Sequence, residues 1–142
     1  MNAMRITFYI ILALLFLACP VCAEPVVIVN QNSGVDSLKR EQVIDLFMGR
    51  SRAFPNGHRA IPCDQGFKSS TAAQFYKLLT GRTLAQINAY WARLIFTGRA
   101  MPPLQLRGNE KVMEEVRRNP AAIAYVDETY VDDTVKVIFR FQ

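Results

Sequence analysis

With 142 residues, the chain is long enough for one compact domain but not for two. Its 17 Lys and Arg against 12 Asp and Glu favour anionic partners such as small anions, acidic proteins or anionic lipid. The basic residues are scattered and are not interleaved with aromatic residues, so no nucleic-acid partner is indicated. Because His58 is the only histidine, the sequence has no Cys/His cluster for zinc and no His-based catalytic triad other than one using His58.

The N-terminal segment has the pattern of a secretory signal peptide. A basic start at Met1–Arg5 is followed by the apolar run Ile6–Ala18, a proline, and residues of small or modest size up to Ala23. This order predicts a signal peptide over residues 1–23 with cleavage after Ala23, and therefore a periplasmic or secreted protein. The apolar run is shorter than the about 20 residues that span a membrane, so no stable membrane insertion is expected after cleavage. An uncleaved anchor and a lipoprotein modified at Cys19 are the alternatives.

Signal cleavage changes the charge and cysteine counts. Removal of Cys19 and Cys22 leaves Cys63 as the only cysteine, which excludes an internal disulfide. Removal of Arg5 leaves 16 Lys and Arg against 12 Asp and Glu, a net charge of +4. Residues 24–142 contain no linker, repeat or low-complexity segment, so we expect them to form a single domain.

The first half of this domain indicates a strand, a helix and a second strand. Val26–Val29 is a β-branched run, which predicts a buried central strand. Ser37 is placed to cap a helix that runs to about Phe47, and Gly49 suits the left-handed position after it. A short strand is expected at Ala60–Cys63, at a sheet edge or ending early, because its proline lacks the N–H that a ladder needs.

Two further helices are expected next. One begins after Ser69-Ser70-Thr71 and stops at Gly81. Thr83 opens the other, with Gln86 completing a capping-box pattern, and Gly98 ends it. Apolar residues recur at helical spacing in this second helix and predict a core face with one large aromatic anchor. They are Leu84, Ile87, Trp91, Leu94 and Ile95.

The C-terminal part indicates one more helix and two more strands. Pro102-Pro103 predicts an extended connection, and Asn109 is placed to cap a helix whose last turn is basic. Ala122–Val126 indicates a buried strand, and Val135–Phe141 a strand with one face on the core. Alternating strands and helices predict an α/β fold, a three-layer sandwich in which about four helices flank a mixed sheet.

The loop from Cys63 to Thr71 joins the second expected strand to a helix and is the candidate ligand site. A helix start leaves backbone N–H groups without intrahelical partners and carries the positive end of the helix dipole, so it can hold an oxyanion. The alternative is that Ser69 or Ser70 only caps its own helix. The candidate anion-binding residues are Lys68, Ser69, Ser70 and Thr71.

Four segments in a fixed order carry a family resemblance. They are Leu46-Phe47-Met48-Gly49-Arg50 with Phe54-Pro55-Asn56-Gly57; Ser69-Ser70-Thr71 with Phe75; Tyr90-Trp91 with Phe96-Thr97-Gly98-Arg99 and Pro102-Pro103; and Pro120-Ala121-Ala122-Ile123-Ala124-Tyr125-Val126. Together they resemble the phosphate ABC transporter substrate-binding proteins, and in particular their small single-domain relatives. The resemblance covers nearly all of residues 24–142.

This resemblance implies one lobe of a two-lobed binding protein, with the ligand held at helix N-termini. The family's Ser-Gly-Thr falls on Ser69, Ser70 and Thr71, so Ser70 stands where a glycine is expected. Gln65 and Phe67 stand where the family often has an Arg and an Asp, and both departures bear on phosphate specificity. Three basic residues are candidates to replace the missing positive charge: Lys68, Arg50 and Arg99.

Two classes of function follow. The first is an exported module that binds phosphate or another small oxyanion and is linked to phosphate ABC transport or sensing. The alternative is an envelope interaction or accessory protein that keeps the fold without a ligand, with Arg50–Phe54 and Arg99–Leu106 as contact surfaces. No enzyme activity, cofactor or metal is expected, because Asp132-Asp133 indicates a solvated turn and nothing else offers a paired acid and base.

Overall fold

The computed structural model describes residues 23–66 and 68–142. The expected signal peptide, with Cys19 and Cys22, therefore lies outside the described residues except for Ala23, and so does Phe67. Within the described ranges, no helix is both long enough and apolar enough to cross a membrane.

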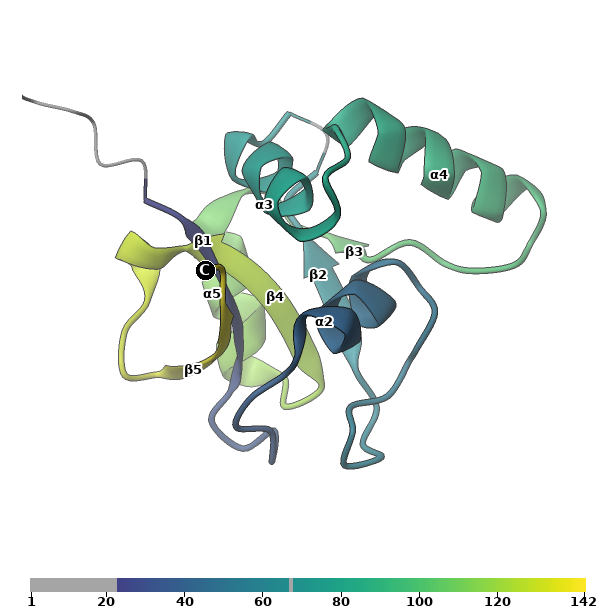
Figure 1. Ribbon diagram of the computed structural model, residues 1–142. Helices are drawn as coiled ribbons and strands as arrows, with labels where there is room; N and C mark the ends of the chain where they lie inside the picture. Colours follow the sequence, from purple (N-terminus) through teal and green to yellow (C-terminus); the bar gives the residue numbers. More distant parts are fainter. Residues whose placement is uncertain (1–22, 67) are drawn as a thin grey trace, which may run out of the picture.

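The described residues form a mixed sheet of five strands in the order β3-β2-β4-β1-β5 (Figure 1). Strand β2 pairs in parallel with β3 and β4, whereas β1 pairs antiparallel with β4 and β5. In chain order the elements are β1 (Pro25–Asn30), α2 (Arg40–Phe47), β2 (Ile61–Asp64), α3 (Ser70–Thr80), α4 (Leu84–Phe96), β3 (Leu104–Gln105), α5 (Gly108–Arg118), β4 (Ala122–Asp127), the 3-10 turn η2 (Glu128–Tyr130) and β5 (Val135–Arg140).

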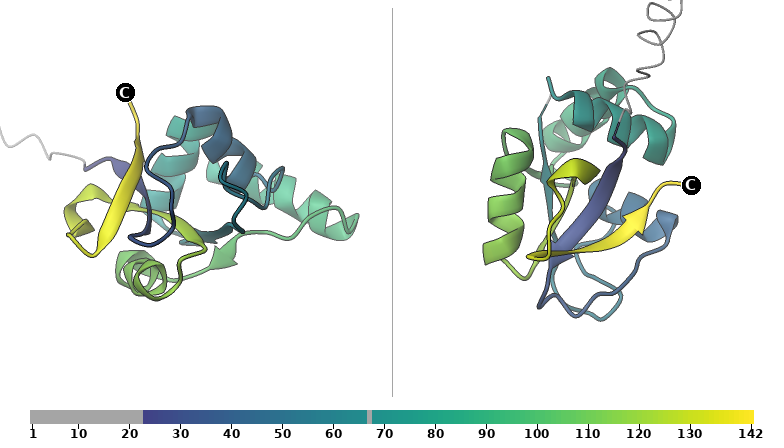
Figure 2. Two further views of the ribbon diagram at one scale, coloured as in Figure 1. Left: turned by 90° about the horizontal axis from the view of Figure 1, so that it is seen from below. Right: turned by 90° about the vertical axis from the view of Figure 1, so that its left-hand side faces the viewer.

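Helices cover both faces of this sheet, which confirms the three-layer α/β sandwich. Figure 2 shows α5 alone on one side, with α2, α3 and α4 on the other. Strands β1 and β4 contribute alternate residues to two apolar clusters, one under each helical layer. Every residue that the structure places in these clusters lies between Val26 and Phe141, so the chain from Glu24 onward carries both cores. Burial on both faces explains the continuous apolar run in β1.

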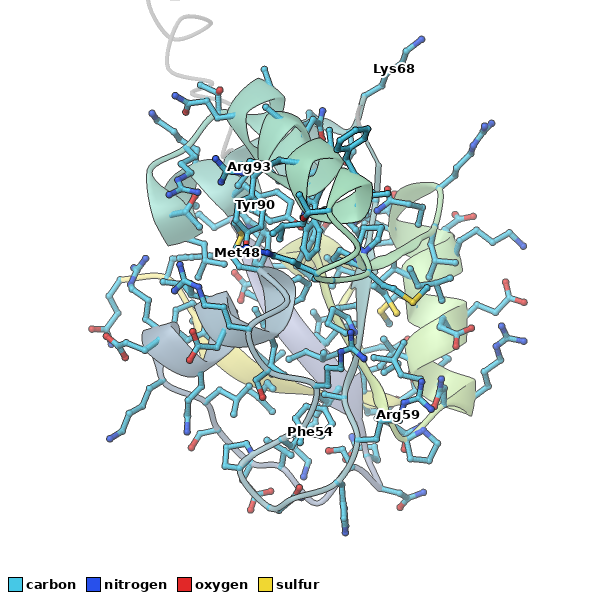
Figure 3. The ribbon with its side chains drawn as sticks, turned by 90° about the vertical axis from the view of Figure 1, so that its right-hand side faces the viewer. Met48, Phe54, Arg59, Lys68, Tyr90 and Arg93 are labelled. Carbon is cyan, nitrogen blue, oxygen red and sulfur yellow. The ribbon has the colours of Figure 1, made fainter. Side chains whose placement is uncertain are left out.

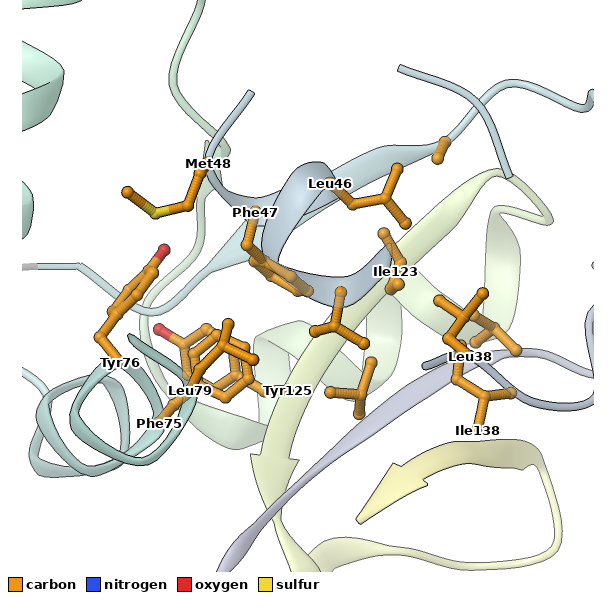
Figure 4. Packing of buried hydrophobic residues seen from close by; sticks show 14 of the residues in the cluster. Leu38, Leu46, Phe47, Met48, Phe75, Tyr76, Leu79, Ile123, Tyr125 and Ile138 are labelled. Atoms are coloured by element: carbon orange, nitrogen blue, oxygen red, sulfur yellow. The ribbon is translucent and has the colours of Figure 1, made fainter. Parts of the chain in front are cut away.

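Aromatic rings fill the larger of the two clusters (Figure 4). Phe75 of α3 stacks on Tyr125 of β4 with ring centroids 3.9 Å apart and planes 12° from parallel. Phe47 of α2 meets the Phe75 ring edge-on at 4.9 Å. These contacts join α2 and α3 to the centre of the sheet, which fixes where α3 begins.

The start of α2 differs from the expectation, because Lys39 and not Ser37 precedes the helix. The N–H of Leu38 donates to the carbonyl of Ile138 at 3.0 Å, which holds this segment extended along β5. The helix therefore begins only at Arg40, and the Gln42 side chain accepts the Lys39 N–H at 2.8 Å. The hydrogen bond between Leu38 and Ile138 therefore outweighs the preference of Ser37 to cap a helix.

Strand β2 lies inside the sheet and not at its edge, because the Pro102-Pro103 connection contains the short strand β3. Strand β3 pairs only with Cys63 and Asp64 of β2. The Ile61 N–H donates to the Ala121 carbonyl beside β4 at 2.8 Å, so the nitrogen of the next residue, Pro62, points away from β4. Because β3 pairs with β2 only from Cys63 onward, the missing N–H of Pro62 leaves no gap in a ladder.

The burial patterns of β5 and α4 also differ from the prediction. In β5, Ile138 is an extra residue against β1, so the side chains before it join one cluster while Ile138 and Phe139 join the other. In α4, Ile87 and Trp91 are buried as expected, but Ile95 is 53% exposed. Figure 1 shows why, since the C-terminal end of α4 projects beyond the sheet.

Candidate functional site

The starts of α3 and α5 face one open depression of about 830 Å³. It lies at the carboxyl ends of the parallel strands β2 and β3, where ligand sites form in α/β sheets. Its walls come from the two strand–helix connections. The lining residues are Gln65, Gly66, Lys68, Ser69, Ser70, Thr71, Gln105, Leu106, Arg107, Gly108 and Asn109.

The start of α3 is capped and still presents donors. Ser69 Oγ accepts the Ala72 N–H at 3.1 Å, so Ser69 has the capping role that the sequence left open. The same hydroxyl donates to Gln65 Oε1 at 3.3 Å. The N–H groups of Ser70 and Thr71 precede any intrahelical partner and sit at the positive end of the helix dipole.

The start of α5 has no side-chain cap. Asn109, expected as that cap, instead lies inside the first turn. Its Oδ1 accepts from Gln65 Nε2 at 2.8 Å and from the Asp127 N–H at 3.0 Å. Asn109 therefore links α5 to the end of β4 and to the residue that follows β2. Gly108 has φ +86°, a value that a side chain would strain, so a glycine is required where the chain enters the helix.

Two basic residues belong to the depression, Lys68 and Arg107. Figure 3 shows the Lys68 side chain extending away from the body into solvent. Arg50 and Arg99 do not line the depression. The guanidinium of Arg50 lies 3.6 Å from the carboxylate of Asp45, and the Arg99 N–H donates to the Leu94 carbonyl at the end of α4.

Sequence reasoning missed Arg107. The signal was present, because an apolar extended segment is followed by Arg107-Gly108 and then by an amphipathic helix. This is the same strand–glycine–helix order that singled out Ser69–Thr71.

A buried carboxylate supports the floor of the depression. Asp64 is 6% exposed, and its two oxygens accept from the Tyr76 hydroxyl at 2.8 Å, from the Gln65 N–H at 2.7 Å and from the Tyr125 hydroxyl. No Lys or Arg among residues 23–66 and 68–142 forms an ion pair with it. Its oxygens are satisfied by neutral donors, and without it the Tyr76 and Tyr125 hydroxyls would lose their acceptor, whereas the Gln65 N–H would keep the Tyr125 hydroxyl oxygen at 3.1 Å.

Gln65 connects this network to both helix starts. Its amide nitrogen donates to Asn109 Oδ1 and to the Tyr125 carbonyl, at 2.8 and 3.0 Å, and its amide oxygen accepts from Ser69. Both amide hydrogens are therefore occupied. Gln65 stands where the family resemblance expects an Arg, and here it positions the walls of the depression.

The buried phenols predict a loss of stability in alkali. Burial, and then the charge of Asp64, raise the pKa of Tyr76 and Tyr125 in the folded protein. An unfolded tyrosine loses its proton near pH 10, so above that pH the folded state binds more protons than the unfolded state. The free energy of unfolding should therefore fall as pH rises from about 10.

Urea unfolding between pH about 8 and about 11.5, followed by Trp91 fluorescence, measures this loss. Tyr76→Phe removes one of the two phenols and should flatten the decline, although it lowers stability at neutral pH. Phenolate absorbance from every tyrosine in a protein that is still folded would contradict the expectation.

The fold matches one α/β lobe of solved substrate-binding proteins, and the depression lies where β2 and β3 end. No model of a known protein family and no curated protein matches the sequence.

Among solved structures, the chain is similar to an ABC-type phosphate transport receptor from Vibrio cholerae, at 21% identity and TM-score 0.64, over 81% of this chain and 45% of that one. A putative phosphate ABC transporter substrate-binding protein with bound phosphate from Clostridium perfringens is 18% identical, with TM-score 0.64, over 81% and 44%. PstS from Borrelia burgdorferi is 11% identical, with TM-score 0.63, over 81% and 46%.

These similarities confirm the expected resemblance at the level of the fold. The chain spans less than half the length of each of these proteins. They are described as transport receptors or substrate-binding proteins, and not as enzymes.

Proposed function

We propose that this protein binds a small oxyanion, phosphate first, in the depression between the starts of α3 and α5. The observation that carries the proposal is that two helix N-termini face one depression, which Arg107 also lines. Among the described residues that line it, none is acidic. Two helix dipoles therefore act on the same space without an opposing carboxylate at its surface.

Backbone groups are the main donors in this proposal. The N–H groups of Ser70, Thr71, Gly108 and Asn109 begin the two helices, and the hydroxyls of Ser70 and Thr71 add short donors. Each dipole contributes about 0.3–1 kcal/mol near the surface. Because the depression is open and its ligand stays partly hydrated, we expect dissociation constants of about 0.1–10 mM for the protein alone.

The proposal extends to export and partners. Residues 1–23 would be a signal peptide and residues 24–142 a single domain that acts in the periplasm or outside the cell. The solved neighbours with a phosphate transport role, one of them with bound phosphate, support phosphate as the ligand and an ABC transporter or another envelope protein as the partner. A second protein or a second copy closing over the depression would strengthen binding.

Isothermal calorimetry with phosphate and sulfate at constant ionic strength tests the proposal. Arg107→Gln removes a cation that lines the depression and should weaken phosphate binding roughly five- to tenfold. Arg99→Gln removes the same charge outside the depression and should change affinity less than about twofold. An equal loss of phosphate affinity in both variants, or no heat of binding with either anion, would contradict the proposal.

A further inference from the structure

Charge is divided unequally along the chain. Residues 46–109 contain nine Lys and Arg and one acidic residue, the buried Asp64. The rest of residues 24–142 contains seven Lys and Arg and eleven Asp and Glu. Of the nine basic residues, only Arg50 has an acidic partner within the part of the chain that the structure describes. The segment that forms α3, α4 and β3 thus presents nearly uncompensated positive charge.

The same segment carries most of the large hydrophobic residues that are exposed in the described part of the chain. Of six large hydrophobic residues that are exposed within the described ranges, all but Tyr130 lie between Leu78 and Leu104. Three of them gather where α4 ends. Ile95 is 53% exposed, Phe96 93% and Met101 80%. Together with Arg93 and Arg99, these three residues are called the α4 tip below.

The α4 tip is an ordered end of a helix. The N–H of Gly98 donates to the Ile95 carbonyl and that of Arg99 to the Leu94 carbonyl, the two bonds of a Schellman motif, with Gly98 at φ +67°. The backbone that follows turns back toward the sheet, and Met101 lines a small hollow with Trp91 and Arg52. These hydrogen bonds fix the backbone from which the exposed side chains project.

The shape of the tip limits its partners. Figure 1 shows α4 projecting from the body, with the tip at its outer end. A stable protein interface buries about 800 Å² on each partner around an apolar centre, whereas this end offers three apolar side chains on a convex surface. A convex apolar end flanked by cations suits a deformable anionic surface, in which the apolar side chains enter below the headgroups.

We propose that the α4 tip docks peripherally on a bilayer that contains anionic phospholipid. Phe96, Ile95 and Met101 enter the interface, and Arg93 and Arg99 lie at the headgroup phosphates. The contact does not cross the bilayer. This proposal stands on the charge distribution and on the exposed helix end, and it does not depend on oxyanion binding in the depression.

Flotation of residues 24–142 with vesicles tests the proposal, because this part of the chain carries both apolar cores. Vesicles of phosphatidylethanolamine and phosphatidylglycerol should bind the protein, and vesicles of phosphatidylcholine alone should bind it much less. Phe96→Ser should lower the partition coefficient roughly tenfold. Arg93→Gln and Arg99→Gln should each lower it roughly fivefold, and added salt should weaken binding.

Matched variants on other surfaces provide the controls. Tyr130→Ser removes an exposed aromatic residue outside the basic segment, and Lys111→Gln removes one charge from α5. Each should change partitioning less than about twofold. Phe96→Trp adds a fluorophore whose emission should shift to the blue on anionic vesicles only.

Three results would overturn the proposal. The first is equal binding to neutral and anionic vesicles. The second is partitioning that Lys111→Gln reduces as much as Arg99→Gln does. The third is a dimer in sedimentation that Phe96→Ser dissociates, without vesicle binding, which would assign the tip to a second copy of the chain.

Discussion

Asp64→Ala is expected to lower the free energy of unfolding by about 3–5 kcal/mol, since each buried donor left unpaired costs about 1–3 kcal/mol. The carboxylate accepts from the hydroxyls of Tyr76 and Tyr125 and from the Gln65 N–H, at a position 6% exposed. Urea unfolding followed by Trp91 fluorescence measures the change.

Two variants bracket this result. Asp64→Asn keeps one oxygen acceptor in the same place and should cost about half as much. Asp133→Ala removes an exposed carboxylate in the turn before β5 and should change stability by less than about 0.5 kcal/mol. If Asp64→Ala were no more harmful than Asp133→Ala, the hydrogen-bond network would not stabilise the fold.

Gly49→Ala is expected to lower stability by about 3 kcal/mol, from backbone strain and overpacking together. Gly49 has φ +73°, and a Cβ there would lie 2.7 Å from Cη2 of the Trp91 ring. The ring is buried under the loop that follows α2, so neither group can move without opening the core.

Gly57→Ala isolates the backbone part of this cost. Gly57 has φ +86°, but a Cβ there would meet nothing within 4 Å. The substitution should cost only about 1 kcal/mol. Thermal and urea unfolding of both variants give the difference, which measures the contact with Trp91. Equal losses would show that the left-handed backbone alone requires Gly49.

Local signals in the sequence predicted the elements whose ends are set by their own side chains. Ser69 and Gly81 limit α3, and Thr83 with Gln86 opens α4, because caps and left-handed glycines act within a few residues. Strand β3 could not be predicted in this way. It has two residues and exists only through its pairing with β2.

Only one wall of the candidate site could be predicted, because only that wall is encoded by a local pattern. The start of α3 follows from the order of residues in one loop, and the structure places it at the depression. The other wall, with Arg107 and Gly108, comes from a remote segment that the β2–β3 pairing brings beside the first. Gln65 and Asn109 became hydrogen-bond partners through that tertiary contact, and no local pattern revealed it.

Titration of the isotopically labelled protein with phosphate, followed by amide ¹H–¹⁵N NMR, tests most directly whether the two helix starts form one anion site. We expect saturable shifts of the Ser70, Thr71, Gly108 and Asn109 amides with a single dissociation constant, and no shift of the Gly57 amide. Shifts at only one of the two helices, or none up to about 20 mM phosphate, would contradict it.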